Sequence, residues 1–332
     1  MFKVAVIQTA FPGDVILSSA IFEALKKQQP CETTAVIRPE SECLLKDNPD
    51  VNHIVVYDKY EDDKGIKGIK RIAGELKGID RAMVVQRHFR STLIPYLARI
   101  PERIGYDNAT ASFLFTKTIK YRQDKHEVER CLDLLGAADF SSQFMPRIYL
   151  DESKIGYANQ ILSDNRIKSN FAVIAPGSVW PTKRYPAYSK VIDLLYQKGS
   201  LPTILLGGRE DISLSSSISE HANHKPIDLT GQTDLLESAA IMARASIVIS
   251  NDSAPAHLAA AMNTPVIAIF GPTSPAFGFA PYSPKSAVVD VEKLYCRPCT
   301  RHGSKRCPER HFECMINLGP GKIIEAVESL LA

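Results

Sequence analysis

Short apolar segments alternate with amphipathic helical segments along most of this chain, and this alternation limits the possible folds more than any other feature. The apolar segments form two series of four, at residues 3–9, 33–37, 51–57 and 81–86 and at residues 171–177, 202–208, 245–250 and 264–271. Strands that are apolar along most of their length are covered on both faces, as in parallel sheets built from βαβ units. We therefore predict an α/β protein with two doubly wound, Rossmann-like domains.

The length of 332 residues agrees with two domains. A new amphipathic helix follows a stretch of low periodicity near residue 150. We place the first domain at residues 1–152 and the second at residues 153–318. Residues 319–332 read as a terminal helix that we expect to pack back across the domain boundary.

Composition and charge exclude several classes of protein. Apolar residues make up 45% of the chain and charged residues 23%, as in ordinary globular proteins. No apolar run reaches the roughly 18 to 20 residues that span a bilayer, and residues 1–14 lack the small-residue cleavage site of a signal peptide. We expect a cytoplasmic protein, and the net charge of +3 gives no indication of a nucleic-acid partner.

The first domain contains one basic stretch, which runs from Arg87 to Arg122. Its Lys and Arg residues outnumber its acidic residues, Glu102 and Asp107. The basic residues are Arg87, Arg90, Arg99, Arg103, Lys117, Lys120 and Arg122. Such a stretch is either a site for an anionic partner or a solvated helix face.

The loop that follows the apolar segment 171–177 has the composition of an anion site. Ligands of doubly wound sheets bind outside the carboxyl ends of the strands. Gly177 permits close backbone approach, and Ser178 and Thr182 offer hydroxyl groups. Lys183 adds a cation suited to a phosphate, although a lysine here can also be an ordinary surface residue.

The segment "SNDSAPAH" at residues 250–257 places Asp252 and Ser253 where a helix begins. The free N–H groups and the dipole at that position favour an anionic group or a sugar hydroxyl. Asp252 can equally be a plain N-cap. His257 lies inside the helix, and we interpret it as a packed or hydrogen-bonding histidine rather than a catalyst.

Two further loops complete a predicted nucleotide-diphosphate site. Gly271, Pro272 and Thr273 end the last apolar segment and offer a second phosphate contact. Glu210 follows another segment and is either a ribose-binding carboxylate or a first-turn helix acid. The chain lacks both G-x-G-x-x-G and G-x-x-x-x-G-K-[ST], which argues against dehydrogenases and kinases.

The corresponding loop of the first domain, "TAFPGDV", offers one carboxylate, Asp14. If an activated sugar is bound, an acceptor hydroxyl loses its proton as it attacks the anomeric carbon. A nearby carboxylate can take that proton, which makes Asp14 our candidate general base. The alternative is a helix-capping aspartate.

Four of the seven cysteines cluster near the C-terminus with the spacing C-x2-C-x7-C-x6-C. This spacing fits a tetrahedral metal site only in part, because the second pair is widely separated. We expect reduced thiols, with bound zinc as the alternative and disulfides disfavoured in the cytoplasm. The four residues are Cys296, Cys299, Cys307 and Cys314.

The quoted loops, together with "NDSAPAHLAAAMNTPVIAIFGPTSP" and the tail "CRPCTRHGSKRCPERHFECM", resemble glycosyltransferase family 9, the ADP-heptose:lipopolysaccharide heptosyltransferases, and within it the heptosyltransferase II type. The resemblance implies a GT-B fold, with the two domains facing a central cleft. It also implies that the first domain binds the acceptor and the second binds the nucleotide sugar. The implied reaction is an inverting transfer of heptose from ADP-heptose to the lipopolysaccharide inner core, without an obligatory metal cofactor. The phosphorylated lipid A acceptor implies peripheral contact with the cytoplasmic face of the inner membrane.

Carried over residue by residue, the resemblance gives Asp14 the role of catalytic base and Lys183 that of holding the donor diphosphate. Asp252 falls near the donor sugar. Gly271, Pro272 and Thr273 fall on the diphosphate loop. From the loops read above we add the donor positions Gly177, Ser178, Thr182, Glu210, Ser253 and His257, and our acceptor positions are Gly13, Arg87, Arg90 and Arg103. The Cys-rich tail occurs in only some members, so the family implies nothing about a metal there.

Three other functions stay open at this stage. The chain can be a transferase with a different donor or acceptor, a two-domain nucleotide-sugar epimerase, or a non-catalytic sugar-nucleotide binding protein. An epimerase would convert the donor alone, whereas a binding protein would show no turnover and would tolerate the loss of Asp14.

Overall fold

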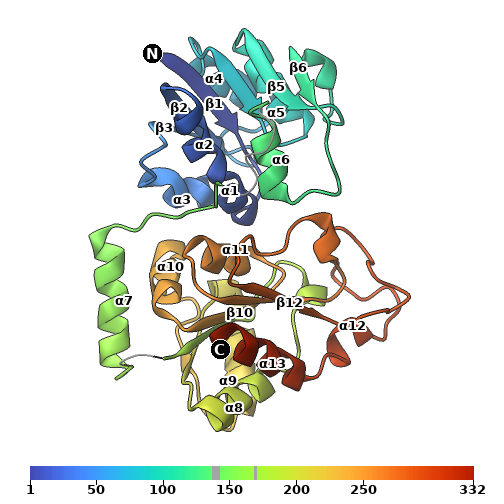
Figure 1. Cartoon of the computed structure of the whole chain (residues 1–332). Helices are drawn as coiled ribbons and strands as arrows, with labels where there is room; N and C mark the ends of the chain where they lie inside the picture. Colours follow the sequence, from blue (N-terminus) through green and yellow to red (C-terminus); the bar gives the residue numbers. More distant parts are fainter. Residues whose placement is uncertain (137–142, 168–169) are drawn as a thin grey trace. The chain divides into compact units, whose positions relative to one another are not determined.

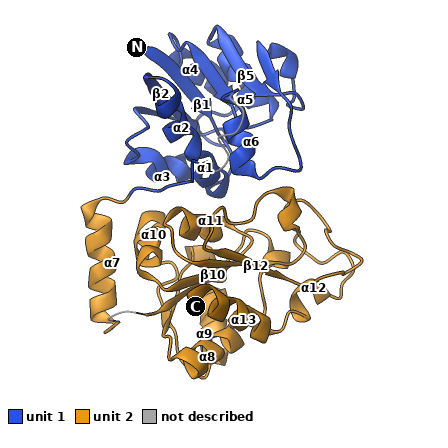
Figure 2. Cartoon of the chain, in the orientation of Figure 1, with its two compact units in different colours: residues 1–149 blue, residues 150–332 orange. Residues whose placement is uncertain are grey.

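The computed structural model describes residues 1–136, 143–167 and 170–332. The chain divides into two compact units, Met1–Tyr149 and Leu150–Ala332 (Figure 2). The division falls three residues before the boundary that we expected. Each unit contains one six-stranded parallel sheet with helices on its faces (Figure 1).

The sheet of unit 1 has the strand order β3-β2-β1-β4-β5-β6. Its strands are β1 (Phe2–Ile7), β2 (Cys31–Ile37), β3 (His53–Val56), β4 (Arg81–Val84), β5 (Glu102–Tyr106) and β6 (Lys117–Ile119). Its helices are α1 (Pro12–Ser18), α2 (Ala20–Gln28), α3 (Glu42–Lys46), α4 (Gly65–Glu75), α5 (Phe89–Leu97) and α6 (Glu127–Asp133), with 3-10 turns η1 (Pro39–Ser41) and η2 (Ser112–Leu114).

The sheet of unit 2 has the order β12-β11-β10-β7-β8-β9. Its strands are β7 (Ala172–Ala175), β8 (Thr203–Leu205), β9 (Ile227–Asp228), β10 (Ile247–Asn251), β11 (Val266–Phe270) and β12 (Ser286–Asp290). Its helices are α7 (Glu152–Asp164), α8 (Tyr188–Gly199), α9 (Ile212–His221), α10 (Leu235–Arg244), α11 (Ala254–Ala261), α12 (Glu313–Ile316) and α13 (Pro320–Leu331), with 3-10 turns η3 (Pro181–Lys183), η4 (Arg209–Asp211) and η5 (Pro275–Phe277).

Both sheets reverse their strand order once, and in doubly wound sheets ligands are expected at that point. The reversal lies between β1 and β4 in unit 1 and between β7 and β10 in unit 2. At such a point the loops at the carboxyl ends of two neighbouring strands run in opposite directions and leave a crevice. The two doubly wound sheets confirm the predicted fold class.

The central strands are as apolar and buried as their sequences suggest. Residues Val4–Ile7 of β1 and all of β10 are almost completely covered, because helices pack on both faces of each sheet. Strands β5, β6, β9 and β12 were not predicted. They are short or carry charged residues, so they lack the continuous apolar run that identified the others.

The C-terminal helix α13 packs on its own unit. It lies against α8 and β12, and its residues Ile323, Ile324 and Val327 are buried in the core of unit 2. Its apolar face is therefore used within unit 2, and our expectation that it packs across the boundary finds no support in these contacts.

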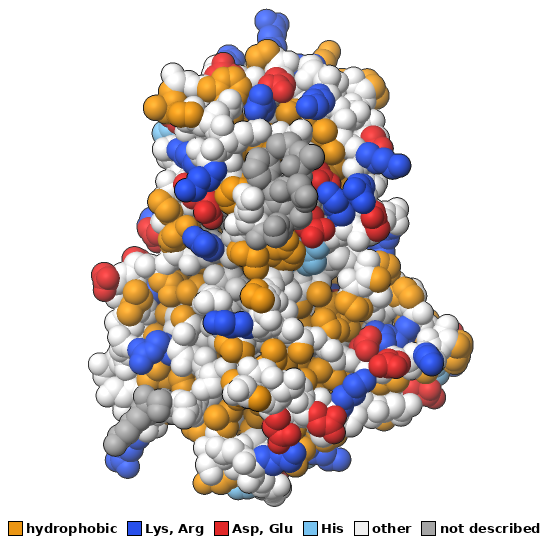
Figure 3. Space-filling view, viewed as in Figure 1, with side chains coloured by type: hydrophobic (Ala, Val, Ile, Leu, Met, Phe, Trp, Pro, Cys, Tyr) orange, Lys and Arg blue, Asp and Glu red, His pale blue; other side chains and the backbone are white. Residues whose placement is uncertain are grey.

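On the face drawn in Figure 3, basic and acidic side chains are interspersed over both units. Within the described residues, no helix is both long and apolar enough to cross a membrane.

Candidate functional site

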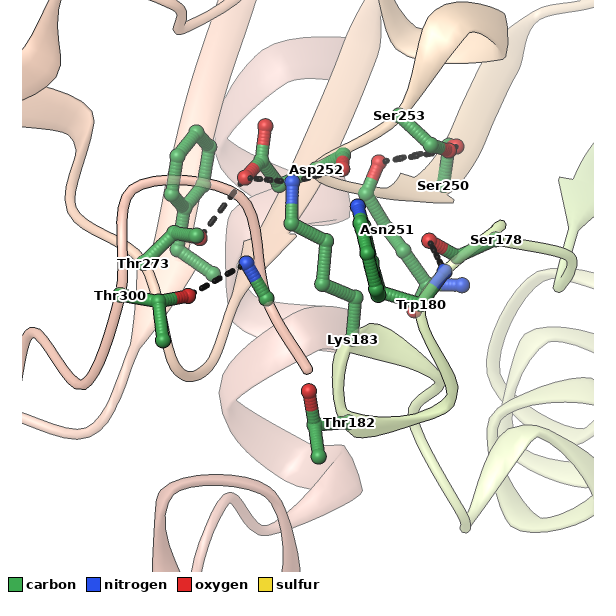
Figure 4. A network of polar contacts seen from close by, with 12 residues as sticks. Ser178, Trp180, Thr182, Lys183, Ser250, Asn251, Asp252, Ser253, Thr273 and Thr300 are labelled. Carbon is green, nitrogen blue, oxygen red and sulfur yellow. Dashed lines mark hydrogen bonds and ion pairs between the residues drawn. The ribbon is translucent and has the colours of Figure 1, made fainter. Parts of the chain in front are cut away.

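A buried ion pair lies at the reversal point of unit 2. The Lys183 ammonium contacts the Asp252 carboxylate at 2.6 Å and donates to the Asp252 carbonyl at 2.9 Å. The two side chains are only 12% and 9% exposed. Lys183 is thus held in place and is not the ordinary surface lysine that remained an alternative (Figure 4).

Asp252 is not the N-cap of α11, because the cap position belongs to Ser253. Instead, its Oδ2 accepts a 2.7 Å hydrogen bond from the Thr273 hydroxyl in addition to the contact with Lys183. Among the residues that the structure describes, no hydrogen bond reaches Asp252 Oδ1, so this oxygen can accept from a ligand hydroxyl. The predicted loops after β7, β10 and β11 therefore meet at one place.

Asn251, which the sequence analysis did not select, fixes the loop after β7 to the end of β10. Its Oδ1 accepts from the Tyr185 N–H at 3.0 Å and from the Tyr188 hydroxyl at 2.9 Å. Its Nδ2 donates to the Pro176 carbonyl at 2.7 Å. The side chain is completely buried and all its hydrogen-bonding groups are used, so it has a structural role.

The backbone at Gly177 lies against a buried carboxylate. A Cβ at this position would meet Asp211 Oδ2 at 2.1 Å, which only glycine avoids. Burial, and then the charge of Glu210, raises the pKa of Asp211. Arg184 lies 3.7 Å from Asp211 and also donates twice to the Ser178 carbonyl. Asp211 and Arg184 thus shape the Gly177–Ser178 loop, a role that no local motif predicted.

The other predicted donor residues have different environments. Ser178 Oγ accepts from the Trp180 N–H at 3.3 Å, and Ser253 Oγ lies 3.3 Å from Ser250 Oγ. Glu210 is exposed in the turn η4, while His257 is buried in α11.

In unit 1, the loops after β1 and β4 meet at the reversal point. Thr9 and Ser91 share a buried 3.1 Å hydrogen bond that joins the loop after β1 to the first turn of α5. Asp14 lies in the first turn of α1, whose N-cap is Phe11, so it does not cap the helix. A first-turn carboxylate is favourably placed in the field of the helix dipole. Gly13 is buried beside it.

Two further cations, Arg38 and Arg90, lie close to Lys59 at this edge of the sheet, and the charge of Asp14 also acts on Lys59. The Lys59 ammonium donates to the Thr9 carbonyl at 2.6 Å, and Arg90 donates to the Lys59 carbonyl at 3.2 Å. Burial and the charges of Arg38 and Arg90 lower the pKa of Lys59, while Glu40 and Asp14 partly offset this shift.

Arg38 also lies over two exposed aromatic rings. Its guanidinium carbon is 4.8 Å from the ring centre of Tyr60 and 5.7 Å from that of Phe11. We call Arg38, Lys59 and Arg90 the cation cluster. Only Arg90 was predicted from the sequence, because the other two cations come from different loops without a common motif.

The remaining predicted acceptor residues are separate from the cation cluster. Arg87 follows β4 and lies over Tyr121 at 4.1 Å. Arg103 lies near the amino end of β5 and donates to the Leu114 and Ile100 carbonyls. Ligands bind at the opposite, carboxyl edge of such sheets, so we leave Arg103 out of the proposed acceptor site.

The Cys-rich segment shows no metal geometry. Among the described residues, which include all four cysteines, no group of three or more Cys, His, Asp or Glu side chains could hold a metal ion. All seven cysteines are free thiols. Burial, with smaller effects of neighbouring cysteines, raises the pKa of Cys314 to about 11. The segment therefore has reduced thiols in this structure, and the zinc alternative gains no support.

Comparison with known proteins places the chain in a family. The model of glycosyltransferase family 9 (heptosyltransferase) matches residues 69–309. Lipooligosaccharide heptosyltransferase 2 of Haemophilus ducreyi is 26% identical over 99% of both chains. The glycosyl transferase family 9 structure from Veillonella parvula covers 99% of this chain and 97% of its own, with a TM-score of 0.87 and 24% identity. The structure of E. coli ADP-heptose lps heptosyltransferase II covers 99% and 98%, with a TM-score of 0.78 and 23% identity. The two sheets and the family match agree, and the chain belongs to glycosyltransferase family 9, the heptosyltransferase family of enzymes.

Proposed function

We propose that this enzyme transfers heptose from ADP-heptose to the inner core of lipopolysaccharide, as a heptosyltransferase of type II. The observation that carries the proposal is the Lys183–Asp252–Thr273 arrangement at the reversal point of unit 2. The names of the relatives support this choice of donor and acceptor. The relatives are named as heptosyltransferases of lipooligosaccharide or lipopolysaccharide, one of them with ADP-heptose.

Unit 2 is the donor-binding part in this proposal. Lys183 and the backbone N–H groups of Gly271 and Thr273, on either side of Pro272, hold the diphosphate, and the Gly177–Ser178 loop approaches it closely. Asp252 Oδ1 accepts from a hydroxyl of the heptose. Glu210, Ser253 and His257 lie on the loops or helices that border this site.

Unit 1 binds the acceptor, and Asp14 acts as the general base. The acceptor hydroxyl oxygen attacks the anomeric carbon while the bond from that carbon to the diphosphate oxygen breaks. The hydroxyl proton passes to the Asp14 carboxylate, and ADP leaves with the electron pair of the broken bond. The attack comes from the face opposite the leaving group, so the configuration inverts.

Negative charge grows on the leaving diphosphate as the bond breaks, which is where Lys183 contributes to the rate. A preorganised cation stabilises such charge more effectively than water does, because no solvent must reorient during the reaction. No metal ion is required in this scheme, and we expect activity to persist in a chelating buffer.

The cation cluster suits an acceptor that carries phosphate or carboxylate groups. Arg38 and Arg90 lie close to Lys59 at the carboxyl edge of the unit 1 sheet, where Asp14 also lies. The rings of Phe11 and Tyr60 offer apolar faces for a sugar. Gly13 lies next to Asp14 in the first turn of α1, and Arg87 lies on the loop after β4. Because this acceptor is a lipid, the enzyme would work in peripheral contact with the cytoplasmic face of the inner membrane.

Mass spectrometry of the products tests the proposal. The enzyme is incubated with a panel of nucleotide sugars and truncated core acceptors. We expect a mass gain of one heptose on the acceptor with ADP-heptose and little with other donors. Conversion of ADP-heptose without any acceptor would indicate an epimerase, and donor binding without turnover would indicate a binding protein.

A further inference from the structure

The Cys-rich segment touches both loops of the candidate donor site. Cys299 N–H donates to the Pro272 carbonyl at 2.8 Å, next to Thr273. Further along, Ser304 bonds with Thr182, the neighbour of Lys183. Eight residues, 297–304, therefore connect the two loops, and they do so from a segment that the reaction itself does not use.

The Thr182 side chain makes two hydrogen bonds between the Lys183 loop and the Cys-rich segment, and the Thr182 backbone makes a third. Thr182 Oγ1 donates to the Ser304 carbonyl at 2.8 Å and accepts from the Ser304 N–H at 2.8 Å. The Thr182 N–H also donates to the Ser304 carbonyl at 3.2 Å. Thr182 is 5% exposed, and its hydroxyl is already engaged in both directions. It is thus poorly suited to the direct donor contact that the sequence suggested.

Gly303 packs directly on the lysine. With a φ of +96°, it is in a conformation that favours glycine. A Cβ at this position would meet Trp180 Cβ at 2.9 Å and Lys183 Cγ at 3.2 Å. The N–H of Gly303 donates to Thr300 Oγ1 at 2.7 Å, which fixes the turn (Figure 4).

Arg297 adds a side-chain contact with the Thr273 loop to the hydrogen bond from Cys299. Its guanidinium donates to the Thr273 carbonyl at 3.1 Å and to the Phe270 carbonyl at 3.4 Å. It also pairs with Asp290 at 2.9 Å, and the side chain is only 10% exposed. The planar guanidinium can hold a carboxylate and carbonyls at the same time, which an ammonium group does less well.

These contacts form a closed ring. Lys183 contacts Asp252, Asp252 accepts from Thr273, and the Thr273 carbonyl accepts from Arg297. The chain from residue 297 to residue 304 then leads to Thr182, which adjoins Lys183. A closed ring restrains each member more strongly than the same contacts in an open chain. A member of the ring is held from both sides, so it can shift only if the contacts on both sides shift as well.

We propose that residues 297–304 are a brace that sets the distance between the Lys183 ammonium and the Thr273 loop. Thr182 and Arg297 are positioning residues that act through Lys183 and Thr273. This inference rests on the proposed role of Lys183 in donor binding. It gives the Cys-rich segment a function that requires no metal.

Calorimetric titration with ADP tests the brace in a double-mutant cycle. Thr182→Val removes both hydroxyl hydrogen bonds with little change of shape, and we expect about three- to tenfold weaker ADP binding. Thr182→Ser restores the hydroxyl and should bind within about twofold of the native chain. In a Lys183→Ala background, Thr182→Val should change the affinity less than about twofold, because the residue through which it acts is gone.

The matched control is Thr264→Val, which removes a buried hydroxyl bond to the Met242 carbonyl at the opposite edge of the same sheet. It should leave ADP affinity unchanged. An equal loss from Thr182→Val in both backgrounds would overturn the brace and indicate a general structural defect. Native affinity of Thr182→Val would overturn it too.

Hydrogen exchange measured on the full chain without ligand separates the brace from the donor assignment. Thr182→Val should accelerate exchange in the peptide covering residues 270–275, although that peptide is about 90 positions away in the sequence. Arg297→Lys should do the same if Thr182→Val fails to fold. If Lys183→Ala binds ADP normally, the donor assignment fails, and the exchange result alone decides the brace. Unchanged exchange in residues 270–275 would then reject it.

Discussion

Lys183 in unit 2 and Lys59 in unit 1 both lie at the carboxyl edge of a doubly wound sheet, but their surroundings differ. Lys183 contacts a carboxylate at 2.6 Å, so its charge is balanced inside the protein. Lys59 donates to a carbonyl, and its pKa is lowered by burial and then by the charges of Arg38 and Arg90, although Arg38 also pairs with Glu40 at 2.6 Å. The first arrangement holds a lysine in a defined position, whereas the second concentrates positive charge that an anion can neutralise.

This difference suggests a division of tasks between the units. A buried ion pair contributes little to stability but orients its members, which suits a group that must stabilise charge as it develops. Repulsion within a cluster of like charges lowers the stability of the ligand-free protein. An anion that binds to the cluster relieves this repulsion and stabilises the folded protein. We therefore assign positioning of the donor diphosphate to unit 2 and attraction of an anionic acceptor to unit 1.

The largest expected effect comes from the carboxylate next to the cation cluster. Asp14→Asn should lower kcat by about two orders of magnitude or more, the usual range for a lost general base. ADP affinity, a property of unit 2 in this account, should stay the same. Turnover at the native rate would remove Asp14 from the reaction, and a loss of ADP binding would contradict the division of tasks.

An intermediate effect is expected from Lys59. Lys59→Gln removes one of the cations that would attract the acceptor, and we expect the KM for a phosphorylated acceptor to rise about fivefold with ADP affinity unchanged. The melting temperature should not fall, because the substitution removes a charge that is destabilised by burial and then by Arg38 and Arg90. Lys70→Gln, an exposed lysine in α4, is the matched control and should leave KM unaltered. Equal effects of the two variants would refute a specific role for the cation cluster.

The smallest effect concerns the loop that carries Lys59. Asp63 accepts from the Asp58 N–H at 3.0 Å and from Arg71 Nε at 2.5 Å. The hydrogen bond from Arg71 holds the pKa of Asp63 below its usual value, although burial opposes this. The carboxylate therefore stabilises the fold above the unfolded-state pKa of about 4, and this contribution is lost as the pH falls through the lower folded-state value.

Asp63→Asn should accordingly lower the stability at pH 7 by about 1 kcal/mol, since Arg71 is nearly half exposed and solvent weakens the pair. The difference between the native chain and the variant should shrink as the pH is lowered toward 3. Thermal melts at several pH values measure this. A difference that stays constant with pH would show that the charge of Asp63 is irrelevant.

The sequence predicted the grouping of Lys183, Asp252 and Thr273 because each follows an apolar strand, and such strands end at the same edge of a parallel sheet. Arg103 was assigned to the acceptor as part of the basic stretch from Arg87 to Arg122, while β5, the short and charged strand that carries it, was not recognised. Without that strand, the sequence did not indicate that Arg103 lies near the amino end of the sheet.

The brace and the cation cluster could not be predicted for a related reason. Arg297 and Thr182 meet their partners through contacts between distant loops, and Lys59 and Arg38 come from separate connections. Strand periodicity predicts at which edge of the sheet a loop lies. It does not predict which residue of an irregular loop contacts a neighbouring loop. Those pairings depend on tertiary packing.

The affinity of the Lys183→Ala chain for ADP, measured by calorimetry, tests the central claim most directly. Lys190→Ala, an exposed lysine of α8, serves as the control for the loss of one positive charge. We predict that Lys183→Ala weakens ADP binding by about tenfold or more and that Lys190→Ala does not. Equal affinities of both folded variants and the native chain would contradict the assignment of the donor diphosphate to Lys183.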